Sequence, residues 1–165
     1  EALHSPLTSG RANQPLPTLT NPLRIVTLRT SIVLGPDHGA LRPMLAIFRA
    51  GLGGPLGSGR QWMSWIHIDD QAALTLFALE NNSITGSLNA AAPHPIRNAD
   101  FTKSLARALH RPALFPVPAF LLKPLLGDFS HELLDSKRVL PRRALAAGFN
   151  YHFPTLDAAL ANLLS

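Results

Sequence analysis

The segment that most restricts the fold of this chain is Leu23–Leu34, with the sequence "LRIVTLRTSIVL". It is rich in β-branched residues and almost continuously apolar, which is typical of a strand buried on both faces of a parallel sheet. The 165 residues hold no second run of this length and character. A complete doubly wound domain needs several buried strands, so the sequence predicts an α/β fold that contains only part of a parallel sheet.

After this segment, helix and strand patterns alternate. Apolar residues recur at helical spacing in three segments, and brief extended segments lie between them. We therefore expect helices over residues 40–50, 70–81 and 99–110, and strands over residues 62–66 and 86–91. Asp69 or Asp70 is the expected N-cap of the second helix and Asn98 that of the third, because these side chains accept hydrogen bonds from free helix N–H groups.

Proline content divides the chain into three parts. Residues 1–22 hold four prolines among small polar residues without periodicity, which predicts a loop or a disordered lead-in. Residues 23–111 carry the α/β pattern. Residues 112–165 consist of short helical pieces cut by prolines and end in a helix behind Thr155, so we expect a small helical C-terminal domain.

The composition limits the partners. The formal net charge is +5, mostly from scattered arginines, and the one tight basic cluster is Lys137–Arg143. Because this cluster has no interleaved aromatic residues, a solvated basic surface is favoured over a nucleic-acid interface. No apolar run approaches the roughly 18 residues of a membrane span. We expect a cytoplasmic protein, with an organellar location left open, that binds neither nucleic acid nor membranes.

The chain starts at Glu1, without an initiator methionine or a leader pattern, and it contains no cysteine. The start predicts a fragment of a longer protein. The lack of cysteine excludes disulfides, a thiol nucleophile and thiolate metal ligands within this sequence.

Three segments resemble ligand or catalytic motifs without meeting their requirements. The Gly-rich run at 51–59 follows a helix, whereas a phosphate-binding loop follows a strand and opens a helix, so a connecting loop is favoured. His67 has no second cluster of ligands nearby, which favours a buried, hydrogen-bonded histidine over a metal ligand. Ser58 and Ser64 lie outside any G-x-S-x-G pattern, so no serine nucleophile is expected.

Both tryptophans of the chain lie in "GSGRQWMSWIHIDD", Gly57–Asp70. They can pack in a core, stack on a base or sugar, or line an interface. Core packing of at least one is favoured, because Trp is largely buried in proteins. Arg60 lies beside them, and a guanidinium group can hold an anionic ligand through two hydrogen bonds.

Four segments share a pattern with a known family. They are "LRTSIVLGP" (28–36), "GGPLGSGRQWMSWIHIDD" (53–70), "GSLNAAAPHPIRNADFTKSLARALHRP" (86–112), and the run from "VPAF" to "RRALAAGF" (117–149). Together they resemble the C-terminal half of extended short-chain dehydrogenases/reductases, in a subgroup described as nucleoside-diphosphate-sugar epimerase-like that ends in a domain of unknown function. The likeness covers about Leu23–Ser165. It implies a partial Rossmann-like fold that lacks the N-terminal dinucleotide-binding half and carries a small helical C-terminal appendage.

The resemblance also implies ligands and site residues. NAD(P) is the implied cofactor of the complete protein, and a nucleotide sugar is the implied small-molecule substrate. The segment matching Gly57–Asp70 lies at the rim of the nucleotide-sugar cleft, and the implied substrate-binding residues there are Arg60, Gln61, Trp62 and Met63. Arg29 and Thr30 lie on the strand that passes the nicotinamide side of the cofactor. No catalytic residue and no metal ligand is expected in this chain.

The sequence departs from that family at three places. Relatives with sugar-nucleotide chemistry have a diphosphate-binding arginine where Met63 stands, with Arg60 as the candidate replacement, and several have an asparagine where Ile32 stands. The dinucleotide-binding glycines and the Tyr-x-x-x-Lys pair belong to the N-terminal half of the family, and the single tyrosine here, Tyr151, is followed by "HFPT". We therefore expect the isolated chain to bind no NAD(P) and to be inactive.

Two other functional hypotheses stay open. The chain can be a noncatalytic module that keeps the fold and binds a nucleotide or a protein partner through its basic face. It can also be a truncated product whose exposed strand edges promote aggregation. For the enzyme hypothesis, the N-terminal half or a second copy of the chain is the expected protein partner.

Overall fold

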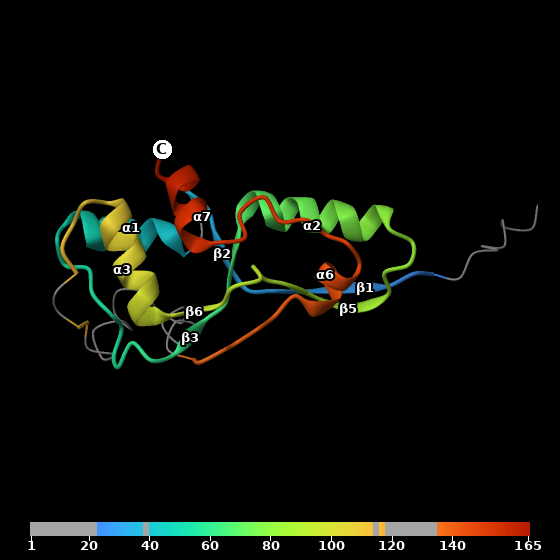
Figure 1. Cartoon of the computed structure of the whole chain (residues 1–165), viewed down its shortest axis with the longest axis horizontal. Coiled ribbons are helices and arrows are strands. Elements are labelled where there is room, and N and C mark those ends of the chain that lie inside the picture. The colour runs from blue at the N-terminus through green and yellow to red at the C-terminus, as the bar shows by residue number, and fades with distance from the viewer. Residues whose placement is uncertain (1–22, 38–39, 114–115, 118–134) are drawn as a thin grey trace, which may run out of the picture.

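The computed structural model of the chain describes residues 23–37, 40–113, 116–117 and 135–165, so the lead-in expected at residues 1–22 lies outside the described residues. The described elements are β1 (Val26–Thr30), β2 (Ile32–Leu34), α1 (Leu41–Arg49), β3 (Trp62–Met63), β4 (Trp65–His67), α2 (Ile68–Glu80), β5 (Gly86–Ala90), β6 (Ile96–Arg97), α3 (Asn98–Ala108), α6 (Arg142–Ala146) and α7 (Leu156–Leu163). The three helices expected in the first part of the chain are confirmed, with ends shifted by one or two residues. Figure 1 shows α2 running along the β1–β5 pair, while α1, α3 and α7 gather at the other end. None of the described helices has the length and apolar character needed to cross a lipid bilayer.

The run Leu23–Leu34 forms two strands, so the expectation of a single strand is wrong. β1 pairs in parallel with β5, and β2 pairs in parallel with β4. The chain changes partner at Ser31, whose N–H and hydroxyl both donate to the carbonyl of Ala90, at 3.0 and 2.9 Å. The expected burial on both faces is also wrong for β1. Thr27 and Arg29 are exposed, whereas Val26 and Leu28, which project to the opposite face, pack against the hydrophobic core. The described residues therefore cover only one face of β1.

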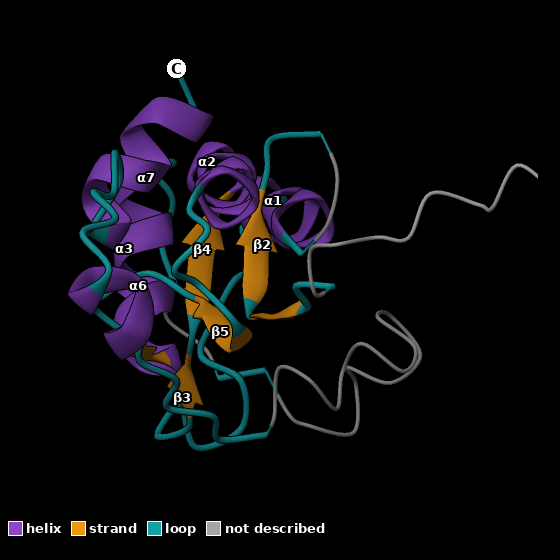
Figure 2. Ribbon diagram, turned by 90° about the vertical axis from the view of Figure 1, so that its right-hand side faces the viewer, coloured by secondary structure: helices purple, strands orange, loops and turns teal. Residues whose placement is uncertain are grey.

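Two hydrophobic clusters form the core of the described residues. The first lies among α1, α3 and α7 and includes the fully buried Leu41, Trp65 and Phe101. The second lies between α2, the β1–β5 pair and α6, and includes Leu74 and Leu88. Figure 2 looks along the molecule and shows strands β2 and β4 next to each other, with α1 and α2 on the same side of them. The expectation that at least one tryptophan packs in the core is therefore confirmed by Trp65.

The C-terminal segment contributes to both clusters. Ala144 of α6 and the following Phe149 pack in the second cluster, whereas Leu156 and Leu160 of α7 pack in the first. The C-terminal segment therefore helps to bury both halves of the α/β region. The boundary expected near residue 112 stays a prediction.

The starts of α2 and α3 differ from the expected caps. The N-cap of α2 is His67, whose Nδ1 accepts the N–H of Asp69 at 3.1 Å and so satisfies a free helix donor. Asp70 instead accepts two backbone N–H groups of the C-terminal segment. Asn98 is the first residue of α3, and its Oδ1 accepts the N–H of Leu56 at 2.7 Å. In both cases a partner distant in the sequence binds the side chain that was expected to cap the helix.

Candidate functional site

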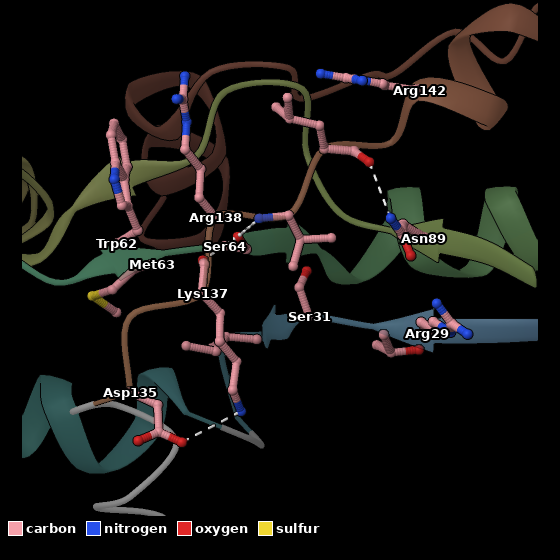
Figure 3. A pocket seen from close by; sticks show the side chains of 14 residues that line it. Arg29, Ser31, Trp62, Met63, Ser64, Asn89, Asp135, Lys137, Arg138 and Arg142 are labelled. Atoms are coloured by element: carbon pink, nitrogen blue, oxygen red, sulfur yellow. Dashed lines mark hydrogen bonds and ion pairs between the residues drawn. The ribbon is translucent and has the colours of Figure 1, made fainter.

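A cavity of about 510 Å³ lies where strands end and the C-terminal segment crosses them. One wall consists of the end of β1, the start of β2, and β3. The other wall is the segment 135–142, which leads into α6. Figure 3 shows side chains from both walls around this cavity.

Arg29 and Asn89 lie in the lining together because they are register partners in the parallel β1–β5 pair. Such partners project to the same face of a sheet. The Nδ2 of Asn89 donates to the carbonyl of Leu140 at 3.2 Å, which ties the second wall to β5. Arg29 is exposed and forms no ion pair with a described residue, so its guanidinium group is available to a ligand.

Trp62 is the aromatic side chain of the lining. It lies opposite Arg97 in the antiparallel β3–β6 pair, and the guanidinium carbon of Arg97 lies 3.9 Å from the centroid of the Trp62 ring. Arg138, from the second wall, approaches the Trp62 ring to 4.7 Å. Both distances lie within the range of cation–π attraction, so the ring restrains the two guanidinium groups.

The described lining holds more positive than negative charge. Its charged residues are the cations Arg29, Lys137, Arg138 and Arg142 and the carboxylate of Asp135. Asp135 lies 3.8 Å from Nζ of Lys137. Like charges around one cavity repel each other, and guanidinium groups bind phosphate or carboxylate oxygens in pairs. The described lining includes no histidine, tyrosine or glutamate, so it is suited to bind an anionic ligand and offers few groups for proton transfer.

The structure brings four of the six implied site residues into one lining and leaves two outside it. The four are Arg29, Thr30, Trp62 and Met63. Gln61 is buried, and its side-chain amide donates to the carbonyl of Leu56 at 3.1 Å. Arg60 is exposed next to the Gly-rich loop, and its carbonyl accepts a hydrogen bond from Arg97.

The Gly-rich loop packs against the start of α3. Gly59 has a φ of +65°, and a Cβ at this position would lie 3.0 Å from the Cβ of Ala99, so glycine is required. The N–H groups of Asn98 and Ala99 donate to the carbonyls of Gln61 and Gly59, at 2.9 and 3.0 Å. Two of the free donors at this helix start are thereby occupied, which agrees with a connecting loop rather than a phosphate cradle.

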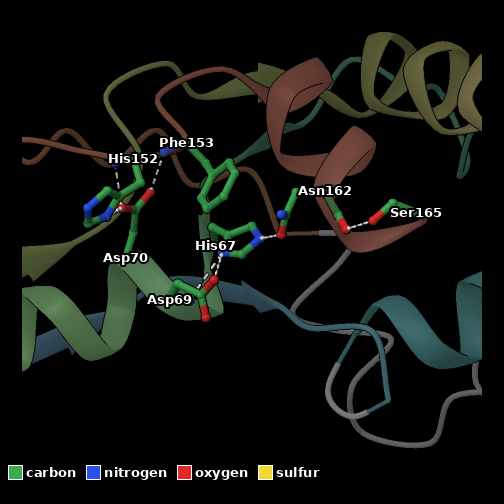
Figure 4. Close-up of polar contacts among 7 residues, drawn as sticks. All are labelled: His67, Asp69, Asp70, His152, Phe153, Asn162 and Ser165. Carbon is green, nitrogen blue, oxygen red and sulfur yellow. Dashed lines mark hydrogen bonds and ion pairs between the residues drawn. The ribbon is translucent and has the colours of Figure 1, made fainter.

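His67 is buried and hydrogen-bonded, as the sequence predicted. It is 1% exposed, its Nε2 lies 3.1 Å from Oδ1 of Asn162, and its ring stacks on Phe153 with 3.9 Å between ring centroids (Figure 4). These contacts give His67 a structural role between α2 and α7. Among the described residues there is no group of three or more side chains that could hold a metal ion.

The cations of the second wall, Lys137, Arg138 and Arg142, are the site residues that the sequence reasoning missed. A signal was present, because they belong to the only tight basic cluster of the chain. From the sequence alone, this cluster is expected to be a solvated surface. The cluster lies at the cavity because the chain returns to β3, where the N–H of Trp62 donates to Oγ of Ser136, 74 positions later.

Two family profiles match the chain. The NAD dependent epimerase/dehydratase family matches residues 18–91, and DUF1731, a domain of unknown function, matches residues 117–163. The second match includes the segment 135–142. The cavity therefore lies between residues of the two matched regions.

The curated relatives are epimerase family proteins. Epimerase family protein SDR39U1 of the mouse is 46% identical over 143 residues, which cover 86% of this chain and 49% of the mouse protein. Epimerase family protein YfhF of Bacillus subtilis is 39% identical over 143 residues, which cover 87% of this chain and 47% of that protein. The chain thus spans about half the length of the curated relatives it matches.

Solved structures show the same relationship. The crystal structure of human SDR39U1 with NADPH has a TM-score of 0.80 and 44% identity, over 85% of this chain and 48% of that one. A nucleoside-diphosphate sugar epimerase from Corynebacterium glutamicum has a TM-score of 0.67 and 29% identity, over 86% of this chain and 26% of that one. A UDP-glucose 4-epimerase from Thermus thermophilus, 20% identical over 84% of this chain and 45% of that one, shares the fold with a TM-score of 0.61. The chain is therefore homologous to the SDR39U1 epimerase-family proteins and has a partial fold of the extended short-chain dehydrogenase/reductase type.

Proposed function

We propose that this chain forms the substrate-side part of an NAD(P)-dependent epimerase-family protein that acts on a nucleotide-sugar-like substrate. The observation that carries the proposal is the cavity, which combines cations for phosphate groups with the aromatic wall of Trp62. Two relatives support it, because the human structure is described with NADPH and the Corynebacterium structure is described as a nucleoside-diphosphate sugar epimerase.

The two walls of the cavity have different roles in this proposal. Arg138 and Arg142 bind the phosphate oxygens of the substrate, and the Trp62 ring packs against its base or sugar. Arg29 and Thr30 lie at the carboxyl end of β1, where ligands of open α/β sheets bind, and their guanidinium and hydroxyl groups fit an anionic dinucleotide. When bound, NAD(P) supplies the hydride-transfer chemistry.

The isolated chain is inactive in this proposal, because the described lining offers few groups for proton transfer and includes no tyrosine. Tyr151 packs edge-on against Phe149, with 4.8 Å between ring centroids, and does not line the cavity. The N-terminal half of the family, or a second copy of the chain, must complete the site. The ligand is a small molecule, and neither nucleic acid nor a membrane is a partner in this proposal.

A noncatalytic binding module is the second candidate function. It is favoured by the same described lining, which offers cations and an aromatic ring but no histidine, tyrosine or glutamate. In this case the chain binds an anionic nucleotide ligand without converting it.

The test of the proposal is thermal melting of the 165-residue chain with UDP-glucose, UDP, uridine or NADPH, together with an assay of NADPH oxidation. A ligand that binds only the folded chain raises its melting temperature. We expect a rise with UDP-glucose and UDP, a smaller rise with uridine, and no NADPH oxidation by the isolated chain. Cooperative melting without a response to UDP-glucose or UDP contradicts the proposal.

A second measurement separates the enzyme from the binding module. It uses a longer protein that includes the N-terminal half and measures epimerisation or oxidation of UDP-sugars. Turnover supports the enzyme. Binding without turnover favours the noncatalytic module.

A further inference from the structure

We infer that residues 136–142, named here the cationic strap, bind the diphosphate group of the ligand. We further infer that Ser64 is a positioning residue that holds the strap in place. This inference rests on the proposed function, because it gives the cations of the strap a role at the same cavity. The strap lies within the region matched by the domain of unknown function. The inference therefore assigns that region a contribution to ligand binding.

Ser64 holds the strap through both hydrogen-bonding capacities of its hydroxyl group. Its Oγ donates to the carbonyl of Lys137 at 2.7 Å and accepts the N–H of Val139 at 2.8 Å. Ser64 is 5% exposed and lies between β3 and β4, so these bonds are partly shielded from water. Together they fix the backbone on both sides of Arg138, and a side chain without a hydroxyl group loses both of them.

Further hydrogen bonds attach the strap to the two neighbouring strands. The N–H of Lys137 donates to the carbonyl of Trp62 at 3.2 Å, and the N–H of Trp62 donates to Oγ of Ser136 at 3.1 Å. At the other end, Asn89 of β5 donates to the carbonyl of Leu140 at 3.2 Å. The strap therefore crosses from β3 to β5, and Figure 3 shows its bonds to Ser64 and Asn89.

This attachment decides where the cations of the strap lie. Arg138 is the residue between the two bonds to Ser64, and its guanidinium carbon lies 4.7 Å from the centroid of the Trp62 ring. Arg142 follows at the start of α6, and Arg29 lies on the other wall. Cations on two facing walls repel each other unless an anion lies between them. A diphosphate carries several negative charges and so stabilises both walls at once.

The experiment measures binding of inorganic pyrophosphate to the whole chain by calorimetry, with hydrogen exchange of the strap amides as a second readout. We expect Ser64→Ala to weaken pyrophosphate binding by about tenfold and to speed exchange in residues 136–140, because both bonds to the strap are lost. The matched control is Ser87→Ala, which removes a half-buried serine hydroxyl from β5 outside the cavity lining and leaves both readouts unchanged. Val139→Pro removes the donor from the strap itself and replaces Ser64→Ala if that variant does not fold.

A double variant separates positioning from general destabilisation. In the Arg138→Ala background, Ser64→Ala should weaken pyrophosphate binding by less than about threefold further, because the two changes act on the same contact. An equal loss in both backgrounds overturns the positioning role of Ser64. Unchanged binding in the folded Ser64→Ala variant, or in Val139→Pro where that variant replaces it, overturns the inference, as does a wild-type chain that binds no pyrophosphate. Binding of pyrophosphate without binding of UDP or UDP-glucose supports the strap and contradicts the nucleotide-sugar proposal.

Discussion

The buried carboxylate of Asp70 accepts the backbone N–H of His152 at 2.8 Å, across 82 positions of the sequence. Its second oxygen accepts the N–H of Phe153 at 3.0 Å, and Asp70 is 0% exposed. Figure 4 shows how this side chain joins the first turn of α2 to the segment that precedes α7. One carboxylate therefore attaches the C-terminal segment to the α/β region.

We expect Asp70→Ala to lower the free energy of unfolding by about 2 to 4 kcal/mol, because two backbone N–H groups lose their charged acceptor inside the fold. Urea denaturation measures this loss. Asp69→Ala is the control, because the Asp69 side chain is 67% exposed and should contribute less than about 1 kcal/mol. Equal losses in the two variants would contradict the role given to Asp70.

Tyr151 gives a pH dependence with a defined sign. Burial raises the pKa of its phenol above the ordinary value of 10.0, and the charge of Asp70 raises it further. The folded state therefore keeps the proton at a pH where the unfolded state loses it. The stability linked to the neutral phenol is fully present below pH 10 and is lost as the pH rises through the raised pKa of the folded state.

We expect Tyr151→Phe to flatten the fall of melting temperature at alkaline pH. Near pH 7 the variant should be as stable as the wild type or slightly more stable, because the buried hydroxyl has no hydrogen-bond partner among the described residues. Melting curves between about pH 7 and 11 measure both effects. The same alkaline slope in the wild type and the variant would show that Tyr151 is not the titrating group.

Arg24, which lies just before β1, connects this segment to the end of α2 through hydrogen bonds. Its guanidinium group donates to the carbonyls of Ala78, Leu79 and Ile84, at 2.8, 2.7 and 3.0 Å. We expect Arg24→Ala to destabilise the chain by about 1 to 2 kcal/mol, because the last carbonyls of the helix lose their donors. Arg49→Ala is a suitable control in the same denaturation experiment, since Arg49 is exposed at the end of α1. A larger loss with Arg49→Ala than with Arg24→Ala would contradict this assignment.

Helix positions could be predicted from the sequence because apolar spacing is a local property, as the agreement between the expected 40–50 and the observed Leu41–Arg49 shows. The change of strand partner at Ser31 could not, since it depends on Ala90 and Ser64, which are distant in the sequence. The same reason explains the cap of α2, where Asp70 binds the C-terminal segment and His67 takes the cap position.

The candidate site shows the same limit. Arg29 and Trp62 were found through the family resemblance, and the structure places both in the lining. Arg138 was visible in the sequence only as part of a basic cluster, because its contact with Trp62 joins residues far apart in the chain. Arg60 has the positive charge expected of a residue that binds an anion, but it lies outside the lining.

Apolar residues at the start of β1 and on α2 form an exposed surface. Ile25 is 65% exposed and Leu79 64% exposed, and both line a shallow groove beside β1. Exposed apolar surface beside a strand edge promotes association of chains.

We expect the isolated chain to aggregate as its concentration rises. Leu79→Lys should reduce this aggregation, as measured by light scattering. Leu52→Lys changes an exposed leucine of the Gly-rich loop and should reduce the scattering less. Equal effects would mean that this surface is not the contact.

The cavity between the strand ends and the cationic strap is the proposed ligand site. The most direct test is a calorimetric titration of UDP into the wild-type chain, Arg138→Ala and Arg60→Ala. We expect the wild type to bind UDP and Arg60→Ala to keep the same affinity. Arg138→Ala should lose about tenfold or more in affinity, and a tenfold loss equals about 1.4 kcal/mol. A wild-type chain that binds no UDP, or a loss in Arg60→Ala with full affinity in Arg138→Ala, would contradict this proposal.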